Sequence, residues 1–188
     1  TWCLVGSEMC IRDSHMVDLM RFFAGDFVKV KSFIKNNFWD YDVEDNAYAI
    51  METNTGIVGV LNSSATQWRH KFNLDITLER GNLILEGILT SSKSYGEETL
   101  TIVNVDHSNN SGMPDEEVIK YVEDPSWQLE MDHFVDCILQ KKQVEYGSSK
   151  DAFETMKLVY NIYYADEIWR DKYIIPNPSE YELSLIHI

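Results

Sequence analysis

Hydrophobic and polar positions recur along the chain with two different periods, which predict helices near both ends and strands between them. The run from His15 to Ala24 places apolar side chains at helical spacing, and Gly25 follows where a helix commonly ends. The next run, FVKVKSFI, alternates apolar and polar residues, which indicates a half-buried strand.

Short strands joined by tight turns are predicted through the middle of the chain. Asn54-Thr55-Gly56 separates two strand-like runs and predicts a hairpin. The runs FNLDITLE and LILEGIL flank a turn at Arg80-Gly81-Asn82, and TLTIVNV predicts a further strand. Residues 107–115, rich in Ser, Asn, Gly and Pro, are typical of a loop.

The last third of the chain is predicted to be helical. WQLEMDHFVDCILQ carries an apolar stripe at helical spacing, and a second helix is expected from Ser149 to about Trp169. The stripe of the first helix consists of Leu129, Phe134, Cys137 and Ile138. The stripe of the second runs through Phe153, Met156, Val159 or Tyr160, and Tyr163 or Tyr164. Strands joined by hairpins and followed by helices predict an α+β fold: an open, mostly antiparallel sheet with helices on one face.

Composition and charge exclude several classes of function. The formal net charge of −15 argues against a nucleic-acid surface, which needs clustered Lys and Arg. No apolar run approaches the roughly 20 residues that span a bilayer, so no membrane contact is expected. The three scattered cysteines give no disulfide framework, so a cytoplasmic location is the default. The histidines and cysteines show no metal-ligand spacing, and no glycine-rich phosphate motif is present, so no metal and no cofactor-binding residue is predicted in this chain.

Both ends of the chain look foreign to the domain. Residues 1–14, TWCLVGSEMCIRDS, and residues 183–188, LSLIHI, resemble translated sequencing adapters of the kind found at the ends of metagenomic reading frames. Segments of this kind are left out of fold reasoning. The authentic domain is therefore expected to run from residue 15 to residue 182.

His15 and Asp18 form the most informative polar pair in the sequence. Residues three apart share one face of a helix, so the imidazole and the carboxylate are expected to project from the same turn. A histidine of near-neutral pKa is suited to accept a hydroxyl proton while hydride leaves the same carbon. An isolated pair of this spacing is also compatible with a purely structural role.

Four stretches together resemble the C-terminal domain of the Gfo/Idh/MocA oxidoreductases. They are SHMVDLMRFFAGDF, EDNAYAIMETNTGIVGVLNSS, ITLERGNLILEG and the segment from MDHFVDCILQ to YYADE. The resemblance implies a parent protein with an N-terminal Rossmann domain that binds NAD or NADP, a domain that is absent from this chain. It also implies that His15 is the proton-relay base and that Asp18 is a recurrent family Asp. The family's second Asp would fall at Ile11, inside the adapter-like segment, and its catalytic Lys would lie in the missing domain.

Other candidate residues could bind a ligand or could have a purely structural role. Trp68, Arg69 and His70 precede a strand, where they could bind a sugar or a sugar-linked phosphate or simply pack at a sheet edge. Asn73 and Asp75 could bind hydroxyl groups or face solvent. The aromatic residues of the last helix are expected in the core, and Cys137, with no basic neighbour on its stripe, is expected to be a buried inert thiol. This last aromatic set comprises Tyr160, Tyr163, Tyr164 and Trp169.

Two hypotheses about function follow. In the first, the chain is the substrate half of an NAD(P)-dependent sugar or polyol dehydrogenase, a nucleotide-linked sugar being one candidate substrate, and it is inactive and binds no cofactor alone. In this hypothesis Asp18, Trp68 and Arg69 bind substrate and His15 accepts the proton. In the second, the chain is a non-enzymatic ligand-binding or oligomerisation module. Both hypotheses expect the open sheet face to pair with another copy of the chain.

Overall fold

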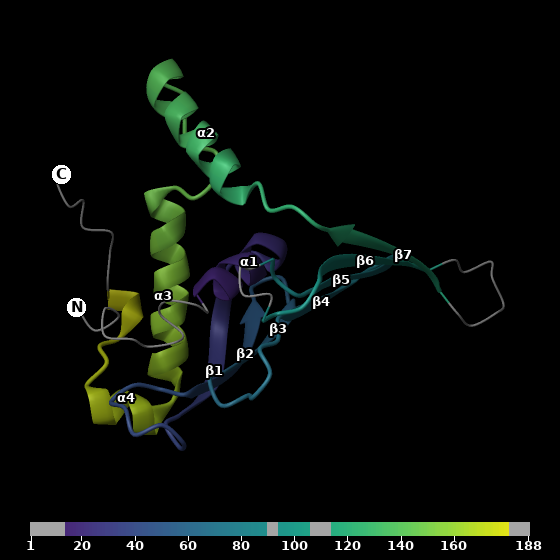
Figure 1. Cartoon of the computed structure of the whole chain (residues 1–188). Helices are drawn as coiled ribbons and strands as arrows, with labels where there is room; N and C mark the ends of the chain where they lie inside the picture. Colours follow the sequence, from purple (N-terminus) through teal and green to yellow (C-terminus); the bar gives the residue numbers. More distant parts are fainter. Residues whose placement is uncertain (1–13, 90–93, 106–113, 181–188) are drawn as a thin grey trace. The chain divides into compact units, whose positions relative to one another are not determined.

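The computed structural model describes residues 14–89, 94–105 and 114–180, which group into two compact units. The first unit is built from residues up to Thr66 and from Val144 onward, and the second from the continuous segment Gln67–Gln143. All strand pairs of the described residues are antiparallel, and no doubly wound parallel sheet occurs among them. The predicted α+β class is therefore confirmed (Figure 1).

The first unit contains a three-stranded sheet covered by helices. Its elements are α1 (Ser14–Ala24), β1 (Phe27–Lys35), β2 (Asn46–Thr53), β3 (Val58–Ser64), α3 (Ser149–Ala165), α4 (Glu167–Tyr173) and a short 3-10 turn (Pro178–Glu180). The strands lie in the order β1-β2-β3, so each pairs with its neighbour in sequence. The predicted helix from residue 15, the first strand and the hairpin around Gly56 are all present.

The second unit contains a separate four-stranded sheet. Its elements are β4 (Asn73–Leu78), β5 (Gly81–Glu86), β6 (Glu98–Asn104), β7 (Asp115–Tyr121) and α2 (Ser126–Gln140). The strands again lie in sequence order. The loop predicted at residues 107–115 lies mostly outside the described residues, and its last residue, Asp115, begins β7. β7 itself was not predicted, because its sequence, DEEVIKY, carries four charged residues and lacks a clean apolar alternation.

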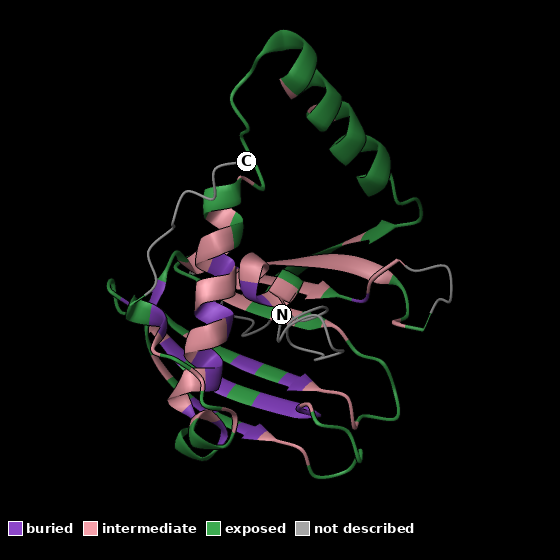
Figure 2. Cartoon of the chain, turned by 90° about the vertical axis from the view of Figure 1, so that its left-hand side faces the viewer, coloured by how far each residue is buried: buried purple, intermediate pink, exposed green. Residues whose placement is uncertain are grey.

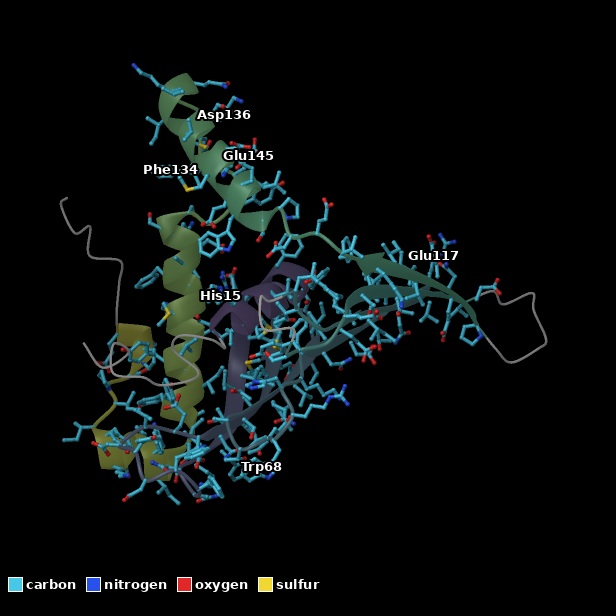
Figure 3. The ribbon with its side chains drawn as sticks, viewed as in Figure 1. His15, Trp68, Glu117, Phe134, Asp136 and Glu145 are labelled. Carbon is cyan, nitrogen blue, oxygen red and sulfur yellow. The ribbon has the colours of Figure 1, made fainter. Side chains whose placement is uncertain are left out.

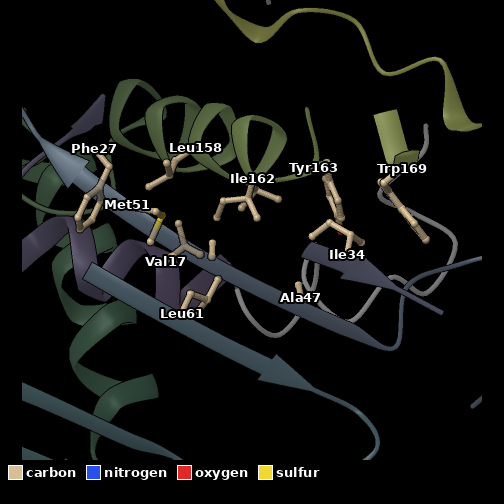
Figure 4. Close-up of a cluster of buried hydrophobic side chains, with 12 residues drawn as sticks. Val17, Phe27, Ile34, Ala47, Met51, Leu61, Leu158, Ile162, Tyr163 and Trp169 are labelled. Atoms are coloured by element: carbon tan, nitrogen blue, oxygen red, sulfur yellow. The ribbon is translucent and has the colours of Figure 1, made fainter. Parts of the chain in front are cut away.

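The core of the first unit lies between α3 and one face of the β1–β3 sheet (Figure 2). Alternate residues of β2 are buried and exposed, as expected when only one face of a sheet is covered. α1 adds Val17, which is completely buried, and the Ser32 hydroxyl donates a hydrogen bond to the Ile162 carbonyl of α3 (2.6 Å). Figure 4 shows this cluster, which includes Phe27, Ile34, Met51, Leu61, Leu158 and Tyr163.

Asp166 ends α3 and begins α4. Its Oδ1 accepts a hydrogen bond from the Trp169 backbone N–H (3.0 Å), as an N-cap residue does, and its Oδ2 accepts one from Ile34 N–H (2.7 Å). The single helix predicted to reach Trp169 is therefore wrong at this point. Tyr163 and Trp169 are buried as predicted, whereas Tyr160 and Tyr164 are only half-buried.

α2 has no buried residue, although its apolar stripe lies where the sequence predicted it. Leu129, Phe134 and Ile138 are each about three-fifths exposed. Cys137 is half-buried rather than buried, and its Sγ lies 3.5 Å from Nε2 of His133. The expectation of a buried thiol without a basic neighbour is therefore wrong, because residues four apart on a helix share one face.

None of the helices in the described ranges is both long enough and apolar enough to cross a membrane.

Candidate functional site

His15 is the second residue of α1, and its side chain is exposed (Figure 3). Within the part of the chain that the structure describes, no hydrogen bond is recorded for the imidazole. His15 is therefore accessible to a ligand, as a proton acceptor must be.

Asp18 lies three residues after His15 on α1, and among the described residues its carboxylate contacts other partners. Its Oδ1 accepts a short hydrogen bond from the Thr155 hydroxyl of α3. The same oxygen lies 3.5 Å from Nη1 of Arg21, one turn further along α1. Asp18 therefore connects two helices, and a substrate contact for it stays a prediction.

Arg21 is the centre of the network that holds α1 against α3. Its side chain is 9% exposed, and Nη1 donates hydrogen bonds to the Thr155 hydroxyl (2.7 Å) and to Asp151 Oδ1 (3.1 Å). Nε and Nη2 both donate to Asp26 Oδ1, at 3.1 and 2.9 Å. Burial acts to lower the pKa of this guanidinium, but the hydrogen bonds and charges of Asp26 and Asp151 outweigh it and raise the pKa above its ordinary value.

The network fixes the helix that carries His15. Thr155 accepts a hydrogen bond from Arg21 and passes one to Asp18, so a charged chain of three groups crosses the helix interface. Asp151 lies in the first turn of α3, where Ser148 caps the helix by accepting its backbone N–H (3.2 Å). The sequence reading missed Arg21, Asp151 and Thr155, because nothing local links positions more than 120 residues apart. The one available signal was Arg21 itself, a cation on a short apolar helix.

Trp68 and Arg69 belong to the second unit and are described separately from His15. Both lie in the segment before β4 rather than in the strand, and both are exposed, Trp68 to 89%. His70 beside them contacts the ring of Tyr95, with ring centroids 5.2 Å apart. Asp75, exposed on β4, accepts a hydrogen bond from Asn82 (3.3 Å). The structure shows accessible aromatic and basic groups here, and their proposed contact with substrate is not tested by it.

The described residues do not supply a site for a metal or for a dinucleotide. Among them, no three His, Cys, Asp or Glu side chains gather closely enough to hold an ion. Their sheets are antiparallel meanders, which lack the strand–turn–helix in which a dinucleotide's phosphates are bound. NAD or NADP therefore does not fit the residues that the structure describes.

Comparison with solved structures shows the same fold in several oxidoreductases. The UDP-N-acetylglucosamine 3-dehydrogenase GnnA from Acidithiobacillus ferrooxidans matches with a TM-score of 0.68 and 18% identity, over 83% of this chain and 47% of its own. An oxidoreductase from Desulfitobacterium hafniense matches with a TM-score of 0.69 and 14% identity, over 85% of this chain and 46% of its own. The WlbA dehydrogenase from Bordetella pertussis, in complex with NADH and UDP-GlcNAcA, matches with a TM-score of 0.63 and 17% identity, over 86% and 43%.

This chain thus spans less than half the length of each of these structures. No curated protein matches its sequence. A family profile described as the GFO/IDH/MocA C-terminal domain does match, over residues 6–84. The matched range begins inside the segment read as adapter-like, so the assignment of residues 6–14 stays a prediction. The profile and the fold together confirm the resemblance seen in the sequence motifs: residues 6–84 match the GFO/IDH/MocA C-terminal domain, and the chain has the fold of these oxidoreductase structures.

Proposed function

We propose that this chain is the substrate-side domain of an NAD(P)-dependent dehydrogenase acting on a sugar or polyol, with His15 as the proton acceptor. The observation that carries the proposal is the placement of His15: an exposed imidazole on a helix whose position is fixed by the buried Arg21 network. A general base must be accessible to substrate and held in place, and this arrangement provides both.

The redox chemistry would come from NAD or NADP bound by a domain that this chain does not contain. The residues here would bind and orient the substrate and accept the proton of its hydroxyl group at an imidazole nitrogen of His15. Asp18 would act mainly through α1, because its carboxylate is already engaged by Thr155 and Arg21. Trp68 and Arg69 would contact the sugar or a phosphate attached to it.

Two of the similar structures support a nucleotide-linked sugar as the substrate class. One is a UDP-N-acetylglucosamine 3-dehydrogenase and another holds UDP-GlcNAcA together with NADH. Their identity to this chain is below 20%, so the support is for the class of ligand and not for one sugar.

The decisive experiment joins this domain to the natural upstream domain, read from the source DNA. We expect His15→Ala to lower kcat/KM for the substrate by at least about 100-fold, the low end for a lost general base. His133→Ala, which removes a histidine from α2 in the other unit, is the matched control and should leave turnover unchanged. Unchanged turnover in His15→Ala would assign His15 a structural role and end the proposal.

Two simpler observations test the same idea. The natural gene should encode Asp at the position of Ile11; an apolar residue there would weaken the catalytic assignment. The 188-residue chain alone should show no saturable binding of NADH by fluorescence titration. Micromolar binding would show that the cofactor site lies in this chain and not in an upstream domain.

A second role, self-association, is favoured by the outer face of the β1–β3 sheet. Phe33 and Tyr48 are register partners on this face, as are Ile50 and Val60, and these four side chains are 41–69% exposed. A contiguous apolar face of this kind marks an interface in many proteins. We propose that it pairs with another copy of the chain. Light scattering should then show a dimer that Ile50→Lys dissociates, whereas Lys150→Ala, an exposed position on α3, which packs on the opposite face of the sheet, should leave it intact.

A further inference from the structure

Three aromatic rings are exposed together in the loop that joins β1 to β2. Phe38, Trp39 and Tyr41 are 58%, 40% and 66% exposed, respectively. They lie within four residues of one another and belong to the first unit. The function proposed for His15 does not use them. We refer to these three side chains as the aromatic platform.

Hydrogen bonds hold the first part of the loop and the Trp39 ring in place. The Asp45 Oδ2 atom accepts hydrogen bonds from the backbone N–H groups of Asn37 (2.9 Å), Phe38 (2.7 Å) and Trp39 (3.2 Å). Asp45 is almost fully buried. The Trp39 indole N–H donates to the Ala65 carbonyl (3.3 Å), which ties the ring to the segment after β3. A ligand that docks here would therefore meet little ordering cost in the protein.

The three rings pack against one another in a defined geometry. The planes of Trp39 and Tyr41 are within 17° of parallel, with centroids 6.3 Å apart, so their faces are aligned. Phe38 meets Trp39 edge-on, at 84° and 4.9 Å, and supports it from the side. In this stacked pair each ring is partly exposed, and an exposed aromatic face is a surface on which the C–H face of a sugar ring can stack.

Polar groups border the platform. Asp40 and Asp42 are exposed carboxylates in the same loop, and Asp42 is fixed by a hydrogen bond from the Tyr173 hydroxyl (3.0 Å). The Lys172 ammonium lies 4.7 Å from the centre of the Tyr173 ring. This is the same tyrosine whose hydroxyl bonds to Asp42. The border thus offers acceptors and one cation beside apolar faces.

We propose that the aromatic platform is a binding site for a neutral pyranose sugar, distinct from the site at His15. A pyranose has an apolar C–H face that stacks on aromatic rings and hydroxyl groups that donate to carboxylates. The two carboxylates and the net charge of −15 disfavour phosphorylated and acidic sugars and nucleic acid. The same charge opposes pairing of two copies through this acidic loop.

The test is a titration of the full chain with cellobiose, followed by the indole N–H signals of the five tryptophans in two-dimensional NMR. Trp39→Phe assigns the Trp39 signal. We expect that signal to shift saturably, with a Kd of about 1 mM, a usual value for a small surface site. Tyr41→Ala should raise the Kd by about fivefold to tenfold, which corresponds to the loss of one stacking contact. Trp127→Ala, which removes an exposed tryptophan from α2, should leave the affinity unchanged.

Each other outcome contradicts the proposal. Absence of a saturable shift, an equal shift of the Trp127 signal, or an unchanged Kd in Tyr41→Ala would remove the sugar site. Glucose 6-phosphate binding as tightly as cellobiose would contradict the role of Asp40 and Asp42. Broadening of the Trp39 signal with protein concentration alone would identify a second copy as the occupant instead.

Discussion

The hydroxyl of Thr155 donates a hydrogen bond to the Asp18 carboxylate, although the two residues lie on different helices and 137 positions apart. The same hydroxyl accepts a hydrogen bond from Arg21 (2.7 Å), so it bridges the Asp18 carboxylate and the Arg21 guanidinium. This contact joins α1, which begins the described structure, to the helix that covers the sheet. α1 also carries His15, so this contact helps to hold the helix on which His15 lies.

Replacing Thr155 with Val should destabilise the chain by about 1–3 kcal/mol, because a half-buried carboxylate and guanidinium each lose a partner. Thr155→Ser keeps the hydroxyl and should recover most of the loss. Urea denaturation of both variants, followed by circular dichroism, measures the difference. Equal midpoints for Val and Ser would show that the hydroxyl adds nothing to stability.

Asp166 should make stability depend on acid pH. Burial acts to raise its pKa, but the hydrogen bonds from Ile34 and Trp169 and the charge of Lys35 hold that pKa below the ordinary 3.8. A carboxyl whose pKa is lower in the folded than in the unfolded chain stabilises the folded state. This contribution is complete at pH values above the unfolded pKa, and it is lost as the pH falls through the folded pKa.

Asp166→Asn, which keeps a good helix cap, should therefore cost about 1–2 kcal/mol near pH 7. The difference in free energy of unfolding between this variant and the parent chain should become smaller below pH 3.8. Denaturation midpoints across that range measure it, with the exposed Asp171→Asn as control. A constant difference at every pH would contradict the role of the charge.

Ile174 adopts a left-handed conformation at the end of α4, with φ of 51° and ψ of 48°. A β-branched side chain is strained in this region, and Ile174 is 86% exposed, so its side chain gains little from packing. Ile174→Gly should raise the free energy of unfolding by about 0.5–1 kcal/mol, after the entropy cost of glycine. Ile168→Gly, similarly exposed but helical, should lower it by about 1 kcal/mol. Thermal melting distinguishes the two.

Gly87 and Gly96 both have positive φ, 72° and 84°, but differ in their surroundings. A Cβ at Gly87 would lie 2.0 Å from the Glu97 carbonyl oxygen, whereas one at Gly96 would meet nothing within 4 Å. Gly96→Ala should cost about 1 kcal/mol from the backbone alone. Gly87→Ala should cost at least about 2 kcal/mol more, because backbone atoms cannot move aside cheaply. Equal melting temperatures would contradict the predicted clash.

Local patterns predicted the elements well and their partners poorly. The helix before Gly25, the first strand and the turn at Gly56 follow from periodicity and turn chemistry, which act within a few residues. The break at Asp166 does not, because it depends on a hydrogen bond from Ile34 on a distant strand. The division into two sheets was also missed, because it depends on which strands pair and not on the residue pattern within each strand.

The candidate site shows the same division. The resemblance identified His15 and Asp18 as family positions, and His15 is exposed in the structure. The partners of Asp18 could not be predicted, because spacing on one helix indicates which residues share a face and not which residue of another helix meets them. Thr155 had no feature in the sequence to mark it.

The insertion of the second unit between β3 and α3 has a consequence for synthesis on the ribosome. The β1–β3 sheet emerges complete while the helix that covers it, Ser149–Ala165, is still to be translated. Until then Ile34, Ala49 and Met51 present a bare apolar surface to solvent or to a chaperone. The nascent chain is therefore most prone to aggregate while residues 67–143 are being made, and a slower translation rate through that segment would lengthen the exposure.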